Sequence, residues 1–363
     1  MGKLGQMPPP HPNTFGHRLG RVGLRGKGAA DPMAETRTVT RPNLQHAEPP
    51  MKLDDDSQAF IDLVRKLGRP PIDSLPPMQA KEVFRRGRMV TQPDLPQVDR
   101  VKDYEAKGPH GPVPLRFYRG AGTADLGNLP CHIYYHGGGW VLGDLDSHDW
   151  VCRKIANAAQ CAVLSVDYRM APEHVFPAAY DDSLAAVQWA IANAALLKID
   201  ASRLSVGGDS AGGNLAASVA IGLRDAGVKL KAQILVYPAV DLSMSGDYYG
   251  RFTKASGLIL TDETMRWFID LYVPKAADRK DWRASPLFAA SLAGLPPTLV
   301  LLAGADPLCA EGEVYAERLK HEGVTATVKH YPGQIHGFLS NGKLLPKANN
   351  AIDDIAAALK AWF

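Results

Sequence analysis

A serine lies at the centre of Gly208-Asp209-Ser210-Ala211-Gly212, and its surroundings are typical of a nucleophile. A short apolar run precedes the serine and a run of small residues with helical spacing follows it, which predicts a strand, a sharp turn and a helix. Glycines two positions before and after the serine avoid a Cβ clash where such a turn approaches neighbouring backbone. The backbone of the serine is expected to be strained, and its hydroxyl oxygen is expected to stand clear above the sheet. In a chain with 34 glycines such a pentapeptide also arises by chance. The other candidate residues of the site therefore decide whether Ser210 is a nucleophile.

A serine hydroxyl needs a general base, and His336 is the candidate because it lies in the loop after the last predicted strand. An acid must then orient the imidazole and stabilise its cation. Asp306 is the candidate acid, since it also follows an apolar strand, with Asp241 as its rival. A helix N-cap is the alternative role for Asp306. The chain order Ser210, Asp306, His336 is that of α/β-hydrolases and differs from the common serine-protease orders.

The glycine-rich stretch His136-Gly137-Gly138-Gly139-Trp140 supplies candidate donors for a developing oxyanion. The expected donors are the backbone N–H groups of Gly138, Gly139 and Ala211. A phosphate-binding loop is the alternative, but the chain has neither a Gly-Lys-Ser/Thr sequence nor a Gly-x-Gly-x-x-Gly entering a helix. His136 is expected to be structural.

The elements that must position these groups alternate between short apolar strands and helices, which predicts a mainly parallel sheet covered on both faces. A hairpin near Gly108-Pro109 begins the series, and ligands of such sheets bind at the carboxyl ends of the strands. The expected strands are 98–106, 113–118, 131–135, 162–166, 204–206, 233–237, 298–303 and 325–331. The expected helices are 147–159, 178–197, 210–225, 262–273, 311–322 and 345–363, with two shorter ones between 51 and 90.

The expected organisation has five parts: a disordered, basic, proline-rich extension, a helical cap in two pieces, and a catalytic α/β domain in two pieces. Their ranges are 1–50 for the extension, 51–95 and 241–285 for the cap, and 96–240 and 286–363 for the catalytic domain.

Composition excludes several classes of function. The net charge is +3, but residues 1–50 hold seven Lys/Arg and three Asp/Glu, so the rest carries one net negative charge. That balance gives no case for nucleic-acid binding. Neither a membrane-spanning run nor a secretory signal is seen, and a cytoplasmic location is expected. The four cysteines are expected to be buried thiols, without a metal site.

Together these motifs resemble the hormone-sensitive-lipase-like, or bacterial family IV, esterases of the α/β-hydrolase fold, in the subgroup with aspartate before the serine. The resemblance covers residues 51–363. Besides the serine, acid and base motifs, its matching stretches are His136-Gly-Gly-Gly-Trp, Gly143-Asp with Ser147-His-Asp, and Asp167-Tyr-Arg-Met-Ala-Pro-Glu-His with Phe176-Pro-Ala-Ala. Two departures are the first 50 residues and Cys309-Ala310, where polar residues are expected.

The resemblance implies a sheet of about eight strands under a helical cap, and a serine carboxylesterase acting on short- to medium-chain esters. It implies no cofactor, no metal and no membrane partner, and a homodimer formed through the edge strand near Thr325–Tyr331. The candidate substrate-binding residues are Trp140, Asp209, Leu258 and Phe338, with Trp267 as either pocket wall or cap core. Arg169 and Glu173 are expected to form a structural ion pair, and Tyr248-Tyr249 to edge the entrance or be exposed.

Two other functions stay open. A small-molecule receptor on the same fold is one, as in the gibberellin receptors, although these lack the base histidine that is present here. Hydrolysis of amides, carbamates or lactones is the other.

Overall fold

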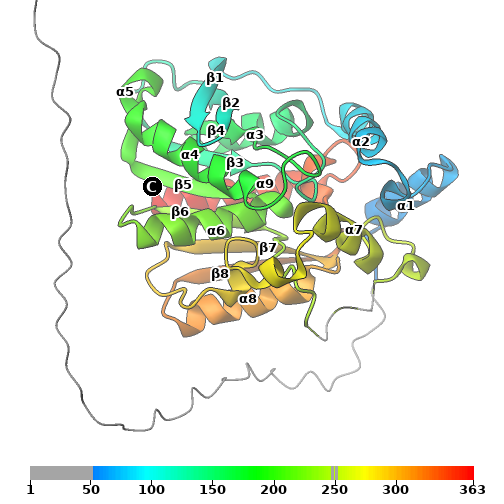
Figure 1. The fold of residues 1–363 in the computed structure, drawn as a ribbon. Coiled ribbons are helices and arrows are strands. Elements are labelled where there is room, and N and C mark those ends of the chain that lie inside the picture. The colour runs from blue at the N-terminus through cyan, green and yellow to red at the C-terminus, as the bar shows by residue number, and fades with distance from the viewer. Residues whose placement is uncertain (1–51, 247–248, 250–251) are drawn as a thin grey trace, which may run out of the picture. The chain divides into compact units, whose positions relative to one another are not determined.

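One sheet of eight strands runs through the described part of the chain, residues 52–246, 249 and 252–363 of a computed structural model. The strand order is β1-β2-β4-β3-β5-β6-β7-β8, so β1 and β8 are the edges (Figure 1). The strands are β1 (Arg100–Gly108), β2 (Gly111–Arg119), β3 (Leu129–Tyr135), β4 (Ala162–Val166), β5 (Ile199–Asp209), β6 (Ala232–Val236), β7 (Thr298–Ala305) and β8 (Ala326–Ile335).

Pairing within the sheet changes direction at β2. The β1–β2 hairpin is antiparallel, as is β2 with β4, whereas all pairs from β4 to β8 are parallel. The inner strands β4 and β6 are buried throughout, whereas the edge strand β8 alternates between partly buried and exposed residues over its first half. The carboxyl ends of β3, β5, β7 and β8 therefore meet along one edge, where their following loops can assemble a site.

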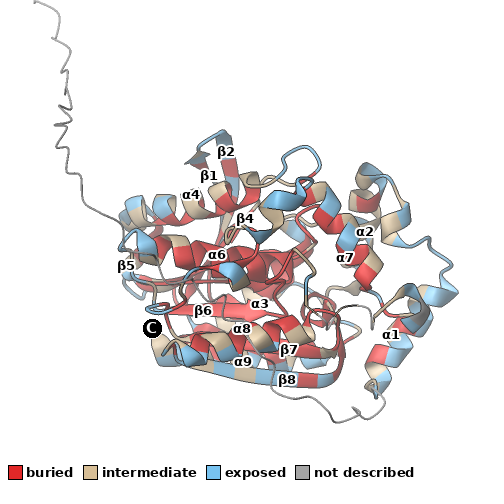
Figure 2. Cartoon of the chain, turned by 60° about the horizontal axis from the view of Figure 1, so that its bottom comes forward, coloured by how far each residue is buried: buried red, intermediate tan, exposed pale blue. Residues whose placement is uncertain are grey.

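Helices cover both faces of this sheet. On one face α3 (Asp149–Ala159) contacts α9 (Lys347–Trp362), and on the other α4 (Ala178–Ala192) contacts α6 (Ala211–Asp225), with α8 (Cys309–His321) over β7 and β8. Their sheet-facing sides are buried and their outer sides are exposed (Figure 2). The short α5 (Ala194–Leu197) precedes β5.

Three helices stand apart from these layers, at one end of the sheet (Figures 1 and 2). They are α1 (Asp55–Lys66), α2 (Pro77–Thr91) and α7 (Asp262–Tyr272). Contacts join the N-terminal segment to the segment that carries α7: Lys254 pairs with Asp73 at 2.8 Å, and Arg65 donates to the carbonyl of Gly257 at 3.2 Å. No helix within the described ranges is long and apolar enough to cross a membrane.

The predicted strands and major helices are all present, with shifts at their ends. The largest strand difference is β5, which extends from Ile199 because Leu129 pairs with that residue before the apolar run begins. The predicted helix 178–197 divides at Asn193 into α4 and α5. Thr261 caps α7, since its hydroxyl accepts from the N–H of Thr264.

Predictions for residues 1–50 and for Tyr248 lie outside the described residues. Short 3₁₀ turns complete the described chain; two of them flank the site, at Asp146–His148 and Phe338–Ser340.

Candidate active site

Ser210 occupies the sharp turn between β5 and α6. Its φ of 56° lies in the left-handed region that a residue with a side chain adopts only at a cost, so the expected strain is present. A Cβ on Gly208 would lie 2.2 Å from the carbonyl oxygen of Tyr135, and one on Gly212 only 1.9 Å from it. Only glycine allows this approach of the turn to β3, which is the steric reason expected for the spacing.

His336 and Asp306 lie next to this serine. His336 follows β8, and its Nε2 is 2.9 Å from Ser210 Oγ. Its Nδ1 is 2.6 Å from Oδ2 of Asp306, which follows β7 and is fully buried. The second oxygen of Asp306 accepts from the N–H of Leu308 at 2.9 Å, which fixes the carboxylate. Serine, imidazole and carboxylate therefore form one hydrogen-bonded chain, suited to moving a proton from the serine.

The structure brings Asp306, and not its rival Asp241, to the imidazole. Asp241 accepts instead from the N–H of Ser243 at 2.9 Å and from the hydroxyl of Ser245 at 3.2 Å. The two aspartates follow neighbouring strands, β7 and β6, so sequence pattern alone left both open.

The glycine loop after β3 makes a tight turn beside the serine. Gly138 (φ 122°) and Gly139 (φ 62°) both have positive φ, and the carbonyl of Gly138 accepts from the N–H groups of Val141 and Leu142. Phe268 of α7 covers the loop, because a Cβ on Gly139 would lie 2.2 Å from its ring. Ala211 is the first residue of α6, so its N–H has no acceptor within the helix. The loop and the start of α6 thus both adjoin the turn that carries Ser210.

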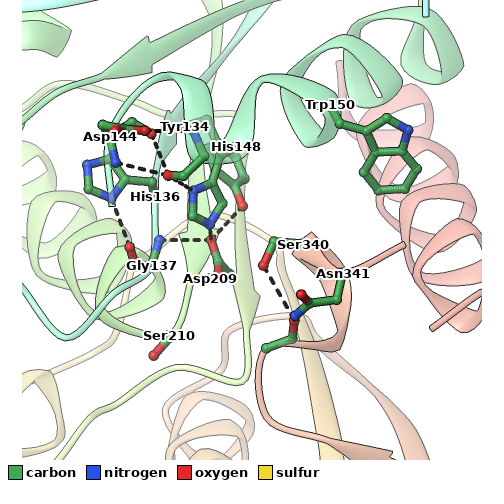
Figure 3. Close-up of polar contacts among 12 residues, drawn as sticks. Tyr134, His136, Gly137, Asp144, His148, Trp150, Asp209, Ser210, Ser340 and Asn341 are labelled. Atoms are coloured by element: carbon green, nitrogen blue, oxygen red, sulfur yellow. Dashed lines mark hydrogen bonds and ion pairs between the residues drawn. The ribbon is translucent and has the colours of Figure 1, made fainter. Parts of the chain in front are cut away.

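Asp209 joins the serine turn to the glycine loop (Figure 3). Its Oδ1 accepts from the hydroxyl of Tyr134 at 2.7 Å and from the N–H of Gly137 at 3.0 Å, and it faces His148 Nε2 at 3.3 Å. Burial raises the pKa of Asp209, but His148 and Tyr134 outweigh it and hold the pKa well below its ordinary value. With these three partners and 3% exposure, Asp209 holds the glycine loop against the serine turn.

His136 is part of the same buried cluster and is structural, as expected. Its ring stacks on Tyr168 with centroids 4.4 Å apart, and its Nδ1 lies 2.8 Å from the carbonyl of Gly137. Burial lowers the pKa of His136, but the nearby carboxylate of Asp167, 3.8 Å from Nε2, leaves it above its ordinary value.

The other candidate substrate-binding residues lie in packed surroundings. Trp140 is fully buried and stacks on Tyr272 of α7 at 4.8 Å. Phe338 is fully buried and its ring contacts Tyr237, which itself lies against His336. Leu258 is 9% exposed. Trp267 is half-buried on α7, as either of its two expected roles requires.

The expected pair of Arg169 and Glu173 is wrong. Arg169 binds Asp182 through two hydrogen bonds of 2.7 Å, and Glu173 pairs with Lys81 at 2.6 Å. Asp182 lies on α4, and its carboxylate is fully buried. An unpaired charge costs more free energy there than on the exposed Glu173, which explains why Arg169 pairs with Asp182. Tyr249 donates to Glu311 and to the carbonyl of Asp241.

One group of side chains in the described region has the spacing of metal ligands. Cys309, Glu313 and His330 place three ligand atoms within 4.8 Å of one another, with the last two exposed. Sequence spacing missed it because His330 comes from a different element. Cys131, Cys152 and Cys161 are buried as expected, whereas Cys309 is half-buried.

Sequence reasoning also missed Arg88, on the inner side of α2. Its Nη2 lies 3.5 Å from the position of a Cβ on Gly337, the residue after His336. Three arginines within four residues of one helix are typical of a solvated surface, so no signal in the sequence distinguished this one.

Residues 132–340 match the sequence profile of a family described as having the alpha/beta hydrolase fold. The chain belongs to this family. It is similar to the carboxylic ester hydrolase LipN of Mycobacterium tuberculosis, with 41% identity over 72% of this chain and 70% of that protein. It is also similar to an ethyl acetate hydrolase of Pseudomonas putida, with 35% identity over 85% of this chain and 99% of that protein.

A solved ester hydrolase from the metagenome of Lake Arreo, in complex with a bipyridine phosphonate derivative, has 42% identity and a TM-score of 0.81. The similarity covers 85% of this chain and 98% of that one. This α/β-hydrolase is therefore a hormone-sensitive-lipase-like carboxylic ester hydrolase.

Proposed function

We propose that this chain is a serine carboxylesterase in which Ser210, His336 and Asp306 form the catalytic triad. The observation that carries the proposal is the hydrogen-bonded chain from Ser210 Oγ through His336 to Asp306, with distances of 2.9 and 2.6 Å. It sits at the carboxyl ends of parallel strands, where enzymes of such sheets act.

The reaction has two steps. His336 Nε2 takes the Ser210 proton while Oγ attacks the ester carbonyl, and the same proton then passes to the leaving alcohol. Water, deprotonated by His336, next attacks the acyl-enzyme, and Ser210 regains its proton as the acid leaves. Asp306 holds Nδ1–H and stabilises the imidazolium in both steps.

We assign the oxyanion in each step to the N–H groups of Gly138, Gly139 and Ala211. Backbone donors held by glycines and by a helix start need no reorganisation when charge develops on the carbonyl oxygen. Asp209 supports this arrangement by binding the N–H of Gly137, next to the first donor.

Substrate choice is assigned to a cap made of residues 51–95 and 241–285. The ion pair of Lys254 with Asp73 and the bond of Arg65 to Gly257 support one cap in two pieces. We propose acyl groups of short to medium length, with Leu258 on the cap side of the pocket. A panel of p-nitrophenyl esters from C2 to C16 should peak between C4 and C8, and a maximum at C12 or longer would contradict this.

The triad is tested by two measurements on the same proteins. A fluorophosphonate should label the wild type at Ser210, and Ser210→Ala should abolish labelling and lower turnover of p-nitrophenyl butyrate by about 10³-fold or more. A variant that keeps full activity would refute the assignment. Absence of labelling, together with tight binding of unreacted ester, would favour the receptor alternative.

We also propose a homodimer formed through β8, an edge strand with unpaired backbone groups on one side. Light scattering at micromolar concentration should give twice the chain mass, and a monomeric mass would contradict it.

A further inference from the structure

Arg88 is the one basic side chain of α2 that lacks an acidic partner within the described residues. On the same helix, Arg85 and Arg86 both pair with Glu82, and Lys81 pairs with Glu173. Arg88 instead points inward, is half-buried, and has no acceptor for its Nε among those residues. Its guanidinium carbon lies over the ring of Phe84, 4.7 Å from the centroid.

A half-buried guanidinium that is not bonded to a carboxylate costs free energy of folding, unless a ligand accepts its hydrogen bonds. Burial lowers the pKa of Arg88, while Tyr237 and Asp209 act in the opposite direction. Asp209 is near enough to interact with this charge, but its Oδ1 faces Tyr134, Gly137 and His148, and no hydrogen bond joins Arg88 to it within the described residues. The donors of Arg88 therefore remain available.

Arg88 also lies against the loop that carries the base. Its Nη2 is 3.5 Å from the Cβ position on Gly337, and Gly337 adjoins His336, whose Nε2 binds Ser210. Tyr237, whose ring is 4.7 Å from that of His336, is among the groups that interact with the Arg88 charge. Gly337 has a φ of 79° and no side chain, so no side chain at that position separates the guanidinium from this loop.

From this geometry we infer that Arg88 is a specificity determinant that binds a carboxylate carried by the ester substrate, a few bonds from the scissile carbonyl. The inference rests on the proposed triad and names the class of ester that the triad acts on. A guanidinium suits this task because its fork of N–H donors matches both oxygens of a carboxylate. The carboxylate belongs to either the acyl or the alcohol part of the ester, and each is a separate arm of the test.

Two isosteric pairs of esters separate charge from shape. Ethyl hydrogen succinate against ethyl 4-methylpentanoate places the carboxylate on the acyl part, and acetoxyacetate against isobutyl acetate places it on the alcohol part. Hydrolysis of each is followed at pH 7 in a pH-stat, with wild type, Arg88→Met, Arg88→Lys and Arg86→Met. Arg86→Met is the matched control, because it removes an exposed arginine of the same helix.

The wild type should have the higher kcat/KM for the anionic member of one pair. Arg88→Met should lower that value by about 10- to 100-fold, the range expected for a charge-assisted bidentate contact, and change the neutral ester less than about 3-fold. Arg88→Lys should retain part of the preference, and Arg86→Met all of it. Melting temperatures of all variants identify any loss that comes from misfolding.

Two results would overturn the inference. An equal loss on neutral and anionic esters would mean that Arg88 only offsets the buried charge of Asp209. Faster wild-type hydrolysis of the neutral member in both pairs would mean that no carboxylate is bound. In either case hydrolysis of the neutral esters through Ser210 leaves the proposed function standing, whereas hydrolysis that survives Ser210→Ala would refute that function instead.

Discussion

Replacing Asp306 by asparagine tests how the imidazole is held. The change keeps the size of the side chain but removes its charge, 2.6 Å from Nδ1 of His336. When His336 takes the serine proton it becomes a cation, and charges about 4 Å apart attract by roughly 4 kcal/mol at an effective dielectric constant of about 20. Losing that attraction alone slows the step by about 10³-fold.

A second effect adds to the first. The asparagine amide can donate to Nδ1, which places the remaining ring proton on Nε2, where it cannot accept from Ser210. We therefore expect kcat to fall by roughly 10³- to 10⁴-fold, with KM changed only a few-fold because Asp306 is buried and does not touch substrate.

The assay is steady-state hydrolysis of p-nitrophenyl butyrate, with Asp241→Asn as the matched control. Asp241 also follows a sheet strand but binds Ser243 and Ser245, so its variant should keep kcat within about 10-fold. If Asp306→Asn kept more than a tenth of the wild-type kcat, or if Asp241→Asn were the crippling change, the acid has been misassigned.

Three further predictions concern the surroundings of the triad. Gly137→Ala would place a Cβ 2.4 Å from Oδ2 of Asp209, so kcat should fall at least about 100-fold, while Gly127→Ala, which meets open space, should be unchanged. Burial lowers the pKa of His132 to about 3, so the unfolded chain binds an extra proton between about pH 6.5 and 3 and stability falls as pH falls through that window. The free energy of unfolding is measured in urea titrations at pH 6 and at pH 4. Between these two pH values it should fall by about 2.5 kcal/mol less for His132→Gln than for the wild type, and an equal fall in both proteins would contradict the lowered pKa. Thr261→Ala should lower the unfolding free energy by about 1 kcal/mol through loss of the cap of α7, and no change in urea midpoint would count against that cap.

The order of strands and helices could be predicted from sequence because the inner parallel strands are short apolar runs separated by helical patterns. A short apolar run such as 162–166 is buried when the chain folds, and β4 has the predicted bounds. The start of β5 could not be predicted, since Ile199 pairs with Leu129 through backbone that carries no apolar pattern. Apart from the hairpin of β1 and β2 and the edge position of β8, sequence did not indicate which strands are neighbours.

The placement of Ser210, Asp306 and His336 followed from a rule of topology, because loops after parallel strands converge at one edge. The pairing of Asp306 rather than Asp241 with the imidazole depended on side-chain direction, which no spacing encodes. Arg88 was missed for a related reason. Its partners, Gly337 and Phe84, come from the far end of the chain and from its own helix, and only the folded structure shows which arginine of α2 faces inward.

The contact of Phe268 with Gly139 bears on how freely parts of this chain could be exchanged with those of its relatives. A segment swap covering residues 241–285 would be made to alter substrate range, but it also replaces the ring that covers the glycine loop. Chimeras in which the donor segment lacks an aromatic residue at this place would combine a new preference with a slower enzyme. Substrate range and rate are thus linked traits here, and a library that varies the cap while retaining Phe268 would separate them.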